Sequence, residues 1–195
     1  LARVQALAKW CRKENILYMP WLRFSLRIPN DVSPKGRQMV YANGITQPVW
    51  SPNSDRLWQG LEKYLLAYAR ISKKHPALIG VFMDFENYAP RRQANHYSLS
   101  YDNVILDMFA KKNQRKIPQL PFEQRKQWLT DQGLHKQFAE FQYGLWKSRC
   151  RNLRQQIDKH NPEFVFTLYP VPGTPFMKKA AFQFLSTSKA PLVHA

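Results

Sequence analysis

The sequence is poor in cysteine and glycine, and it has no long apolar run. Its 195 residues include 2 Cys and 7 Gly. Cys11 and Cys150 stand in helix-like patterns without a C-x-x-C partner, so we expect core residues rather than a redox pair. The apolar runs are far too short to cross a bilayer, and residues 1–12 do not read as a secretory signal. We therefore expect a soluble protein without a membrane span, while its compartment stays open, extracellular and periplasmic locations included.

Acidic residues are also scarce. The chain has 13 Asp plus Glu against 30 Lys plus Arg, which gives a net charge of +17. Basic segments such as "RKIPQLPFEQRK", "KSRCRNLR" and "MKKAAF" fall in expected helices or loops. They are either a solvated outer face or a surface for an anionic polymer. No zinc-finger, RRM or KH pattern favours nucleic acid in particular.

Several motifs of common enzyme classes are missing. The chain contains neither G-x-G-x-x-G nor G-x-x-x-x-G-K-[ST], and it has no G-x-S-x-G nucleophile turn. Its five His lack the H-x-x-x-H spacing of metal ligands, and two of them, His75 and His160, end expected helices. We therefore expect no metal and no cofactor.

Hydrophobic periodicity predicts alternating helices and strands. Helices are expected over residues 1–12, 53–73, 134–160 and 174–186, with shorter pieces at 101–111 and 121–131. Strands are expected within residues 16–24, 77–85, 164–172 and 190–195. Residues 28–53, rich in Pro, are expected to be irregular.

This alternation indicates parallel crossovers, either in an open doubly wound sheet or in a (β/α)8 barrel. The missing glycine motifs argue against the first. The polar residues at expected strand ends favour the second, because barrel enzymes build their sites there. A full barrel needs about 250 residues, so we expect residues 1–195 to form one partial (β/α)8 TIM-barrel domain, about strands three to six.

The stretch "ALIGVFMDFENYAP" ends an apolar strand on two carboxylates. Because side chains alternate along a strand, Phe82, Asp84 and Glu86 should share one face. Carboxylates this close repel each other, which favours the protonated form of one and suits a general acid. The alternative is structural, with Asp84 and Glu86 in buried ion pairs or capping a turn.

Other side chains near expected strand ends suit a sugar site. They are Trp21 and Phe24 on the preceding strand, Asn87 and Tyr88 after the carboxylates, and Tyr169 on the following strand. Aromatic rings at such positions could stack on sugar rings. We therefore predict a carbohydrate site with catalytic Asp84 and Glu86 and with these five residues binding substrate.

The stretch "GVFMDFENY" resembles the fourth strand of (β/α)8 glycoside hydrolases, where the acid/base Glu ends the strand. Gly80, Asp84 and Glu86 match the chitinase signature D-G-x-D-x-D-x-E, whereas Ile79 and Phe82 replace its first two aspartates. Residues 50–172 are similar to uncharacterised bacterial glycosidase-like barrels, with a Pro-containing loop, a W-L segment and an "NP" before the next strand.

This resemblance implies a glycoside hydrolase that cleaves a poly- or oligosaccharide. Glu86 would be its general acid/base, and Asp84 would tune Glu86 or orient a 2-acetamido group. Tyr169 would be a hydrogen-bond donor, and a second catalytic carboxylate would lie outside this chain. The alternative is a non-catalytic barrel that binds carbohydrate or a polyanion. The oligomeric state stays open.

Overall fold

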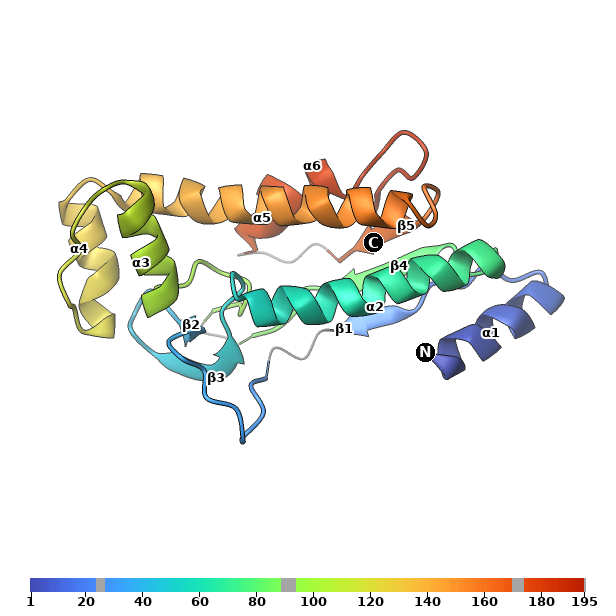
Figure 1. Ribbon diagram of the computed structural model, residues 1–195, viewed down its shortest axis with the longest axis horizontal. Coiled ribbons are helices and arrows are strands. Elements are labelled where there is room, and N and C mark those ends of the chain that lie inside the picture. The colour runs from blue at the N-terminus through green and yellow to red at the C-terminus, as the bar shows by residue number, and fades with distance from the viewer. Residues whose placement is uncertain (24–26, 89–93, 170–173, 195) are drawn as a thin grey trace.

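The computed structural model describes residues 1–23, 27–88, 94–169 and 174–194. Its main feature is a parallel sheet of four strands in the order β1, β4, β5 and β6 (Figure 1). These strands are β1 (Trp21–Arg23), β4 (Gly80–Asp84), β5 (Val165–Leu168) and β6 (Val193–His194).

The expected helices are present as α1 (Ala2–Lys13), α2 (Asp55–Lys74), α3 (Asn103–Lys112), α4 (Arg125–Asp131) and α5 (His135–Asp158). Shorter helical pieces are η2 (Phe122–Gln124), η3 (Met177–Ala181), which is π-helical, and α6 (Phe182–Phe184). None of the described helices is long and apolar enough to span a membrane.

The partial (β/α)8 barrel expected from the sequence is wrong. Over the described residues the parallel sheet is open, with β1 and β6 at its two edges, and no closed barrel forms. The expected parallel crossovers are confirmed, since every neighbouring pair of strands in the sheet is parallel. Alternation alone does not specify closure, however, because closure depends on strand number, tilt and stagger, which a hydrophobic pattern does not encode.

The segment expected to be irregular contains an antiparallel hairpin, β2 (Gln38–Val40) and β3 (Thr46–Trp50). Its turn carries Asn43-Gly44, a strong hairpin signal, so the expectation of an irregular segment is wrong for residues 38–50. The Gly44 N–H donates to the Tyr41 carbonyl at 2.9 Å, and the Tyr41 N–H donates to the Ile45 carbonyl at 2.9 Å. Gly44 has φ +82°, a conformation that glycine adopts without strain.

The main hydrophobic core lies between the sheet and the pair α2 and α5. Figure 1 shows these two helices side by side along the sheet. Val81, Met83 and Phe85 of β4 and its continuation point into this core and are 0%, 4% and 2% exposed. The helices meet them with apolar side chains, among them Leu57, Leu61, Leu65, Trp146, Cys150, Leu153 and Ile157. Cys11 and Cys150 are both buried free thiols, which confirms that they are core residues.

A second core joins α3, α4 and the first half of α5 at one end of the molecule (Figure 1). Phe109 and Phe138 are its centre, with ring centroids 5.2 Å apart in an edge-to-face arrangement. Asp102 begins α3, because its Oδ1 accepts the Ile105 N–H at 3.0 Å. Its burial raises the pKa of the Asp102 carboxyl. Because α5 also reaches the main core, it belongs to both.

Strands β4 and β5 approach most closely at Gly80. A Cβ atom at this position would lie 2.0 Å from the Val165 carbonyl oxygen. No side chain fits that distance without moving one of the strands. Gly80 is therefore required by the packing of the two central strands.

Candidate functional site

A pocket of about 440 Å³ lies beside β4 on the side that faces away from α2 and α5. Its described lining consists of Met19, Trp21, Phe82, Asp84, Glu86 and Tyr169. The predicted alternation along the strand thus brings Phe82, Asp84 and Glu86 to one pocket. Two of the aromatic residues predicted from neighbouring strands, Trp21 and Tyr169, line the same pocket.

The two carboxylates occupy different environments within this pocket. Asp84 is 6% exposed, whereas the side chain of Glu86 is exposed. The Glu86 N–H donates to Asp84 Oδ1 at 2.7 Å, which makes Asp84 the acceptor of a tight turn at the strand end. The structural alternative raised for Asp84, a turn cap, is therefore present. It coexists with the position of both carboxylates in the pocket.

Aromatic side chains form much of the remaining pocket wall. Trp21 is 65% exposed, and it is paired in register with Phe82. The rings of Phe82 and Tyr169 lie 6.4 Å apart at 40°, and Tyr169 is 40% exposed. Trp21 begins β1 rather than ending it, contrary to the sequence-based placement. An exposed indole beside two further rings provides apolar faces for a flat, partly apolar ligand.

Asn87 and Tyr88 are not among the described residues that line the pocket. Asn87 and Tyr88 follow Glu86, and Tyr88 forms an isolated antiparallel bridge with Asn95. The Asn87 carbonyl accepts the His96 N–H at 2.6 Å. Phe24 lies outside the described residues. Asn87 and Tyr88 are thus tied by their backbone to the loop of residues 94–98.

This loop, residues 94–98, supports the strand end. Asn95 is 3% exposed and donates from Nδ2 to the Phe85 carbonyl at 2.9 Å. His96 Nδ1 makes a short hydrogen bond with the Tyr41 hydroxyl, so the loop is also tied to the β2–β3 hairpin. Burial lowers the pKa of His96 and raises the pKa of Tyr41. Nothing in the local sequence distinguishes Asn95 from an ordinary loop asparagine, because its partner is ten residues away.

Clusters of metal-ligating side chains were sought among the described residues. No group of three or more His, Cys, Asp or Glu side chains there could hold an ion. His135, for example, is instead bonded to the Tyr101 hydroxyl at 2.8 Å.

No protein-family model and no curated protein matches this sequence. Among solved structures, the chain is similar to a β-galactosidase from the psychrophilic Marinomonas ef1, with a TM-score of 0.42 and 11% identity. The match covers 86% of this chain and 35% of the β-galactosidase, so the chain spans about a third of that protein's length. At this TM-score and identity, the likeness does not indicate the activity of this chain.

Proposed function

We propose that the pocket beside β4 binds a carbohydrate and that Glu86 acts as general acid/base in hydrolysis of a glycosidic bond. The observation that supports this most is the combination of two carboxylates with Trp21, Phe82 and Tyr169 in one pocket of about 440 Å³. That volume accommodates one or two sugar rings. Aromatic faces stack on the apolar faces of sugars, and carboxylates bind hydroxyl groups and transfer protons.

In this proposal the two carboxylates have separate roles. Glu86 reaches the open part of the pocket and delivers a proton to the oxygen of the leaving group. Asp84 Oδ1 accepts the Glu86 N–H at 2.7 Å, so Asp84 holds the strand end beside Glu86 within the pocket. Trp21 and Tyr169 fix the ring of the substrate beside Glu86.

The decisive experiment replaces Glu86 by Gln. A panel of 4-nitrophenyl glycosides and oligosaccharides identifies a substrate, and turnover is then compared between the wild type and Glu86→Gln. We expect kcat to fall by about 10² to 10⁴ while binding is retained, because only the transferable proton is removed. The control is Glu163→Gln, an exposed residue outside the pocket lining, which should keep full activity. Normal turnover by Glu86→Gln would refute the assignment.

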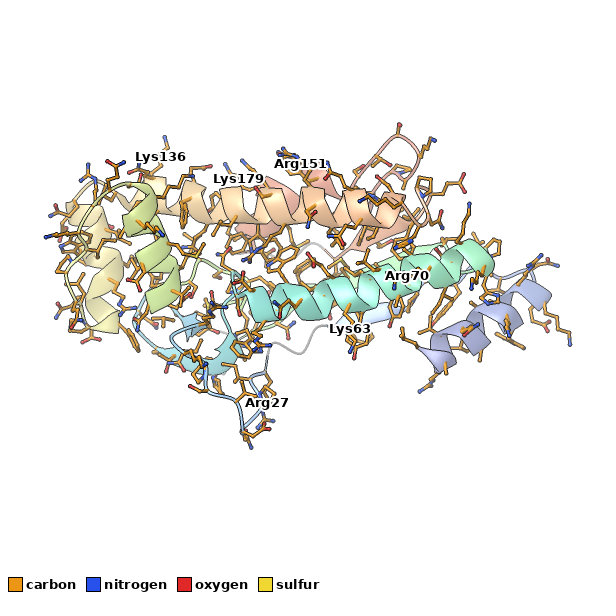
Figure 2. The ribbon with its side chains drawn as sticks, in the orientation of Figure 1. Arg27, Lys63, Arg70, Lys136, Arg151 and Lys179 are labelled. Carbon is orange, nitrogen blue, oxygen red and sulfur yellow. The ribbon has the colours of Figure 1, made fainter. Side chains whose placement is uncertain are left out.

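Exposed cations on α2, α5 and η3 favour a second candidate function, the binding of an anionic polymer. Figure 2 shows Lys63 and Arg70 on α2, Lys136 and Arg151 on α5, and Lys179 beside α5. All five side chains are exposed. Lys179 is 3.7 Å from Glu140, an exposed pair that neutralises little of this field. The second candidate function rests on these exposed cations, which Figure 2 shows spread along both helices rather than gathered at one spot.

Salt titration tests this second function. Heparin and a double-stranded DNA oligomer are the probes, and their affinities are measured between about 50 and 200 mM salt. Release of counterions predicts a steep linear fall of log affinity with log salt. Arg151→Gln together with Lys63→Gln should reduce the slope, whereas Lys116→Gln, in the loop before α4, should change it less. An affinity that does not change with salt concentration would exclude this function.

A further inference from the structure

We propose that Asn95 is a positioning residue for Glu86, and that Asn95 and Asp84 together clamp the peptide unit between Phe85 and Glu86. This inference rests on the proposed function of the pocket. The two ends of one peptide unit are held by two different side chains. The Phe85 carbonyl accepts from Asn95 Nδ2 at 2.9 Å, and the Glu86 N–H donates to Asp84 Oδ1 at 2.7 Å. Because the peptide unit is planar, fixing both ends fixes its plane and with it the position of the Glu86 Cα atom.

A clamp is needed here because the sheet ends just before Glu86. The register between β4 and β5 stops at Met83, paired with Leu168, and the Tyr169 N–H then donates to the Met83 carbonyl at 3.2 Å. Asn95 provides the Phe85 carbonyl with a side-chain donor where the ladder has ended. The Asn87 N–H donates to the same carbonyl at 2.9 Å, so both of its acceptor positions are used.

Asn95 is itself held in one orientation. Its Oδ1 accepts the Tyr97 N–H at 2.8 Å while its Nδ2 donates to Phe85, so turning the amide would break both bonds. Tyr97 packs edge-on against Phe85, with ring centroids 4.8 Å apart at 75°. The loop thus holds Phe85 through its ring as well as through its carbonyl. Asn95 is 3% exposed and is hydrogen-bonded through both atoms of its amide group. It can therefore hold the peptide unit before Glu86 in one position.

Two variants separate the clamp from general loop stability. Asn95→Asp keeps an oxygen that can accept the Tyr97 N–H but has no amide donor for the Phe85 carbonyl. Asn95→Ala removes both bonds. The matched control is Asn113→Ala, because Asn113 also donates to a backbone carbonyl, that of Phe109 at 2.8 Å, and also accepts through Oδ1, from Gln137 at 2.9 Å. Asn113 follows α3, outside the pocket lining.

The experiment has two readouts. The first is amide hydrogen exchange in the intact protein, resolved at the Glu86 N–H. We expect this amide to exchange at least about 10-fold faster in both Asn95 variants, with core amides of β5 and α5 unchanged in Asn95→Asp. The second readout is the kinetics on the aryl glycoside found in the panel. A misplaced Glu86 should lower kcat by about 10- to 100-fold with little change in KM. Asn113→Ala should match the wild type in both.

The outcomes distinguish this inference from the proposed function. Unchanged exchange at Glu86 in Asn95→Asp would overturn the clamp, and so would full kcat in either Asn95 variant. Uniformly faster exchange throughout Asn95→Asp would also overturn it, because the role would then be general stability. A wild type that cleaves no glycoside would refute the proposed function alone, and exchange at Glu86 would still decide whether the clamp exists.

Discussion

The two faces of β4 differ in what they contribute. Val81, Met83 and Phe85 point toward α2 and α5 and are almost completely buried. Phe82, Asp84 and Glu86 line the pocket on the other face. A single residue of slippage would exchange these two sets, placing carboxylates in the core and apolar groups in the pocket. Substitutions on one face or the other should therefore alter stability and the candidate chemistry separately.

The largest expected effect lies on the helix-covered face. Phe166 of β5 is 0% exposed, and its replacement by Ala should lower the free energy of unfolding by about 3 to 5 kcal/mol, because a large cavity is left. Urea denaturation measures this change. Phe82→Ala, on the pocket face, should cost much less stability. An equal cost at both positions would contradict the division between the faces.

The next effect concerns the contact between the two central strands. Gly80→Ala adds a Cβ atom that would lie 2.0 Å from the Val165 carbonyl oxygen, so we expect a loss of about 1 to 3 kcal/mol in unfolding free energy. Gly60→Ala is the matched control, because no atom lies within 4 Å of the added Cβ in α2. The control should raise helix stability by about 1 kcal/mol. Thermal melts of the two variants should therefore shift in opposite directions.

A smaller effect depends on pH and on the loop that supports the pocket. Burial lowers the pKa of His96, so the unfolded chain binds this proton more readily than the folded protein. Stability should therefore be full above the unfolded pKa of about 6.5 and decline as the pH falls below it, at up to about 1.4 kcal/mol per pH unit for one proton. His96→Gln should flatten this dependence in urea titrations from pH 7.5 to 5. An unchanged slope would mean that other groups dominate.

The smallest expected effect on stability comes from the pocket face. Trp21 is 65% exposed, so Trp21→Ala should change the free energy of unfolding by less than about 0.5 kcal/mol. The same variant should weaken binding of the oligosaccharide identified by the panel by about 10-fold, because a stacking face is lost. Isothermal titration calorimetry and urea denaturation together provide the measurement. Retained affinity would remove Trp21 from the proposed site.

The sequence predicted the local elements well because most of them bury one periodic face. The expected helix over 53–73 is α2, and the long helix expected over 134–160 is α5. The Pro content of residues 28–53 predicts an irregular segment, whereas Asn43-Gly44 turns residues 38–50 into a hairpin. Closure of the sheet could not be predicted, since it depends on how strands tilt and stagger in three dimensions.

The candidate site was partly predictable for the same reason. Asp84 ends β4 and Glu86 lies two residues further on, so the extended alternation of the chain brings both to one pocket. Trp21 and Tyr169 could be proposed because neighbouring parallel strands bring distant residues to one place. Asn95 could not be found this way, because its role depends on a bond to the Phe85 carbonyl that no pattern in the sequence encodes.

Helix α5 passes through both hydrophobic cores. Phe138 and Phe141 near its start belong to the core with α3 and α4, and Trp146 and Ile157 belong to the core beneath the sheet. Neither core can lose its packing without exposing part of this one helix. Denaturation should therefore follow a single cooperative transition, with the same midpoint whether far-ultraviolet circular dichroism or tryptophan fluorescence is recorded.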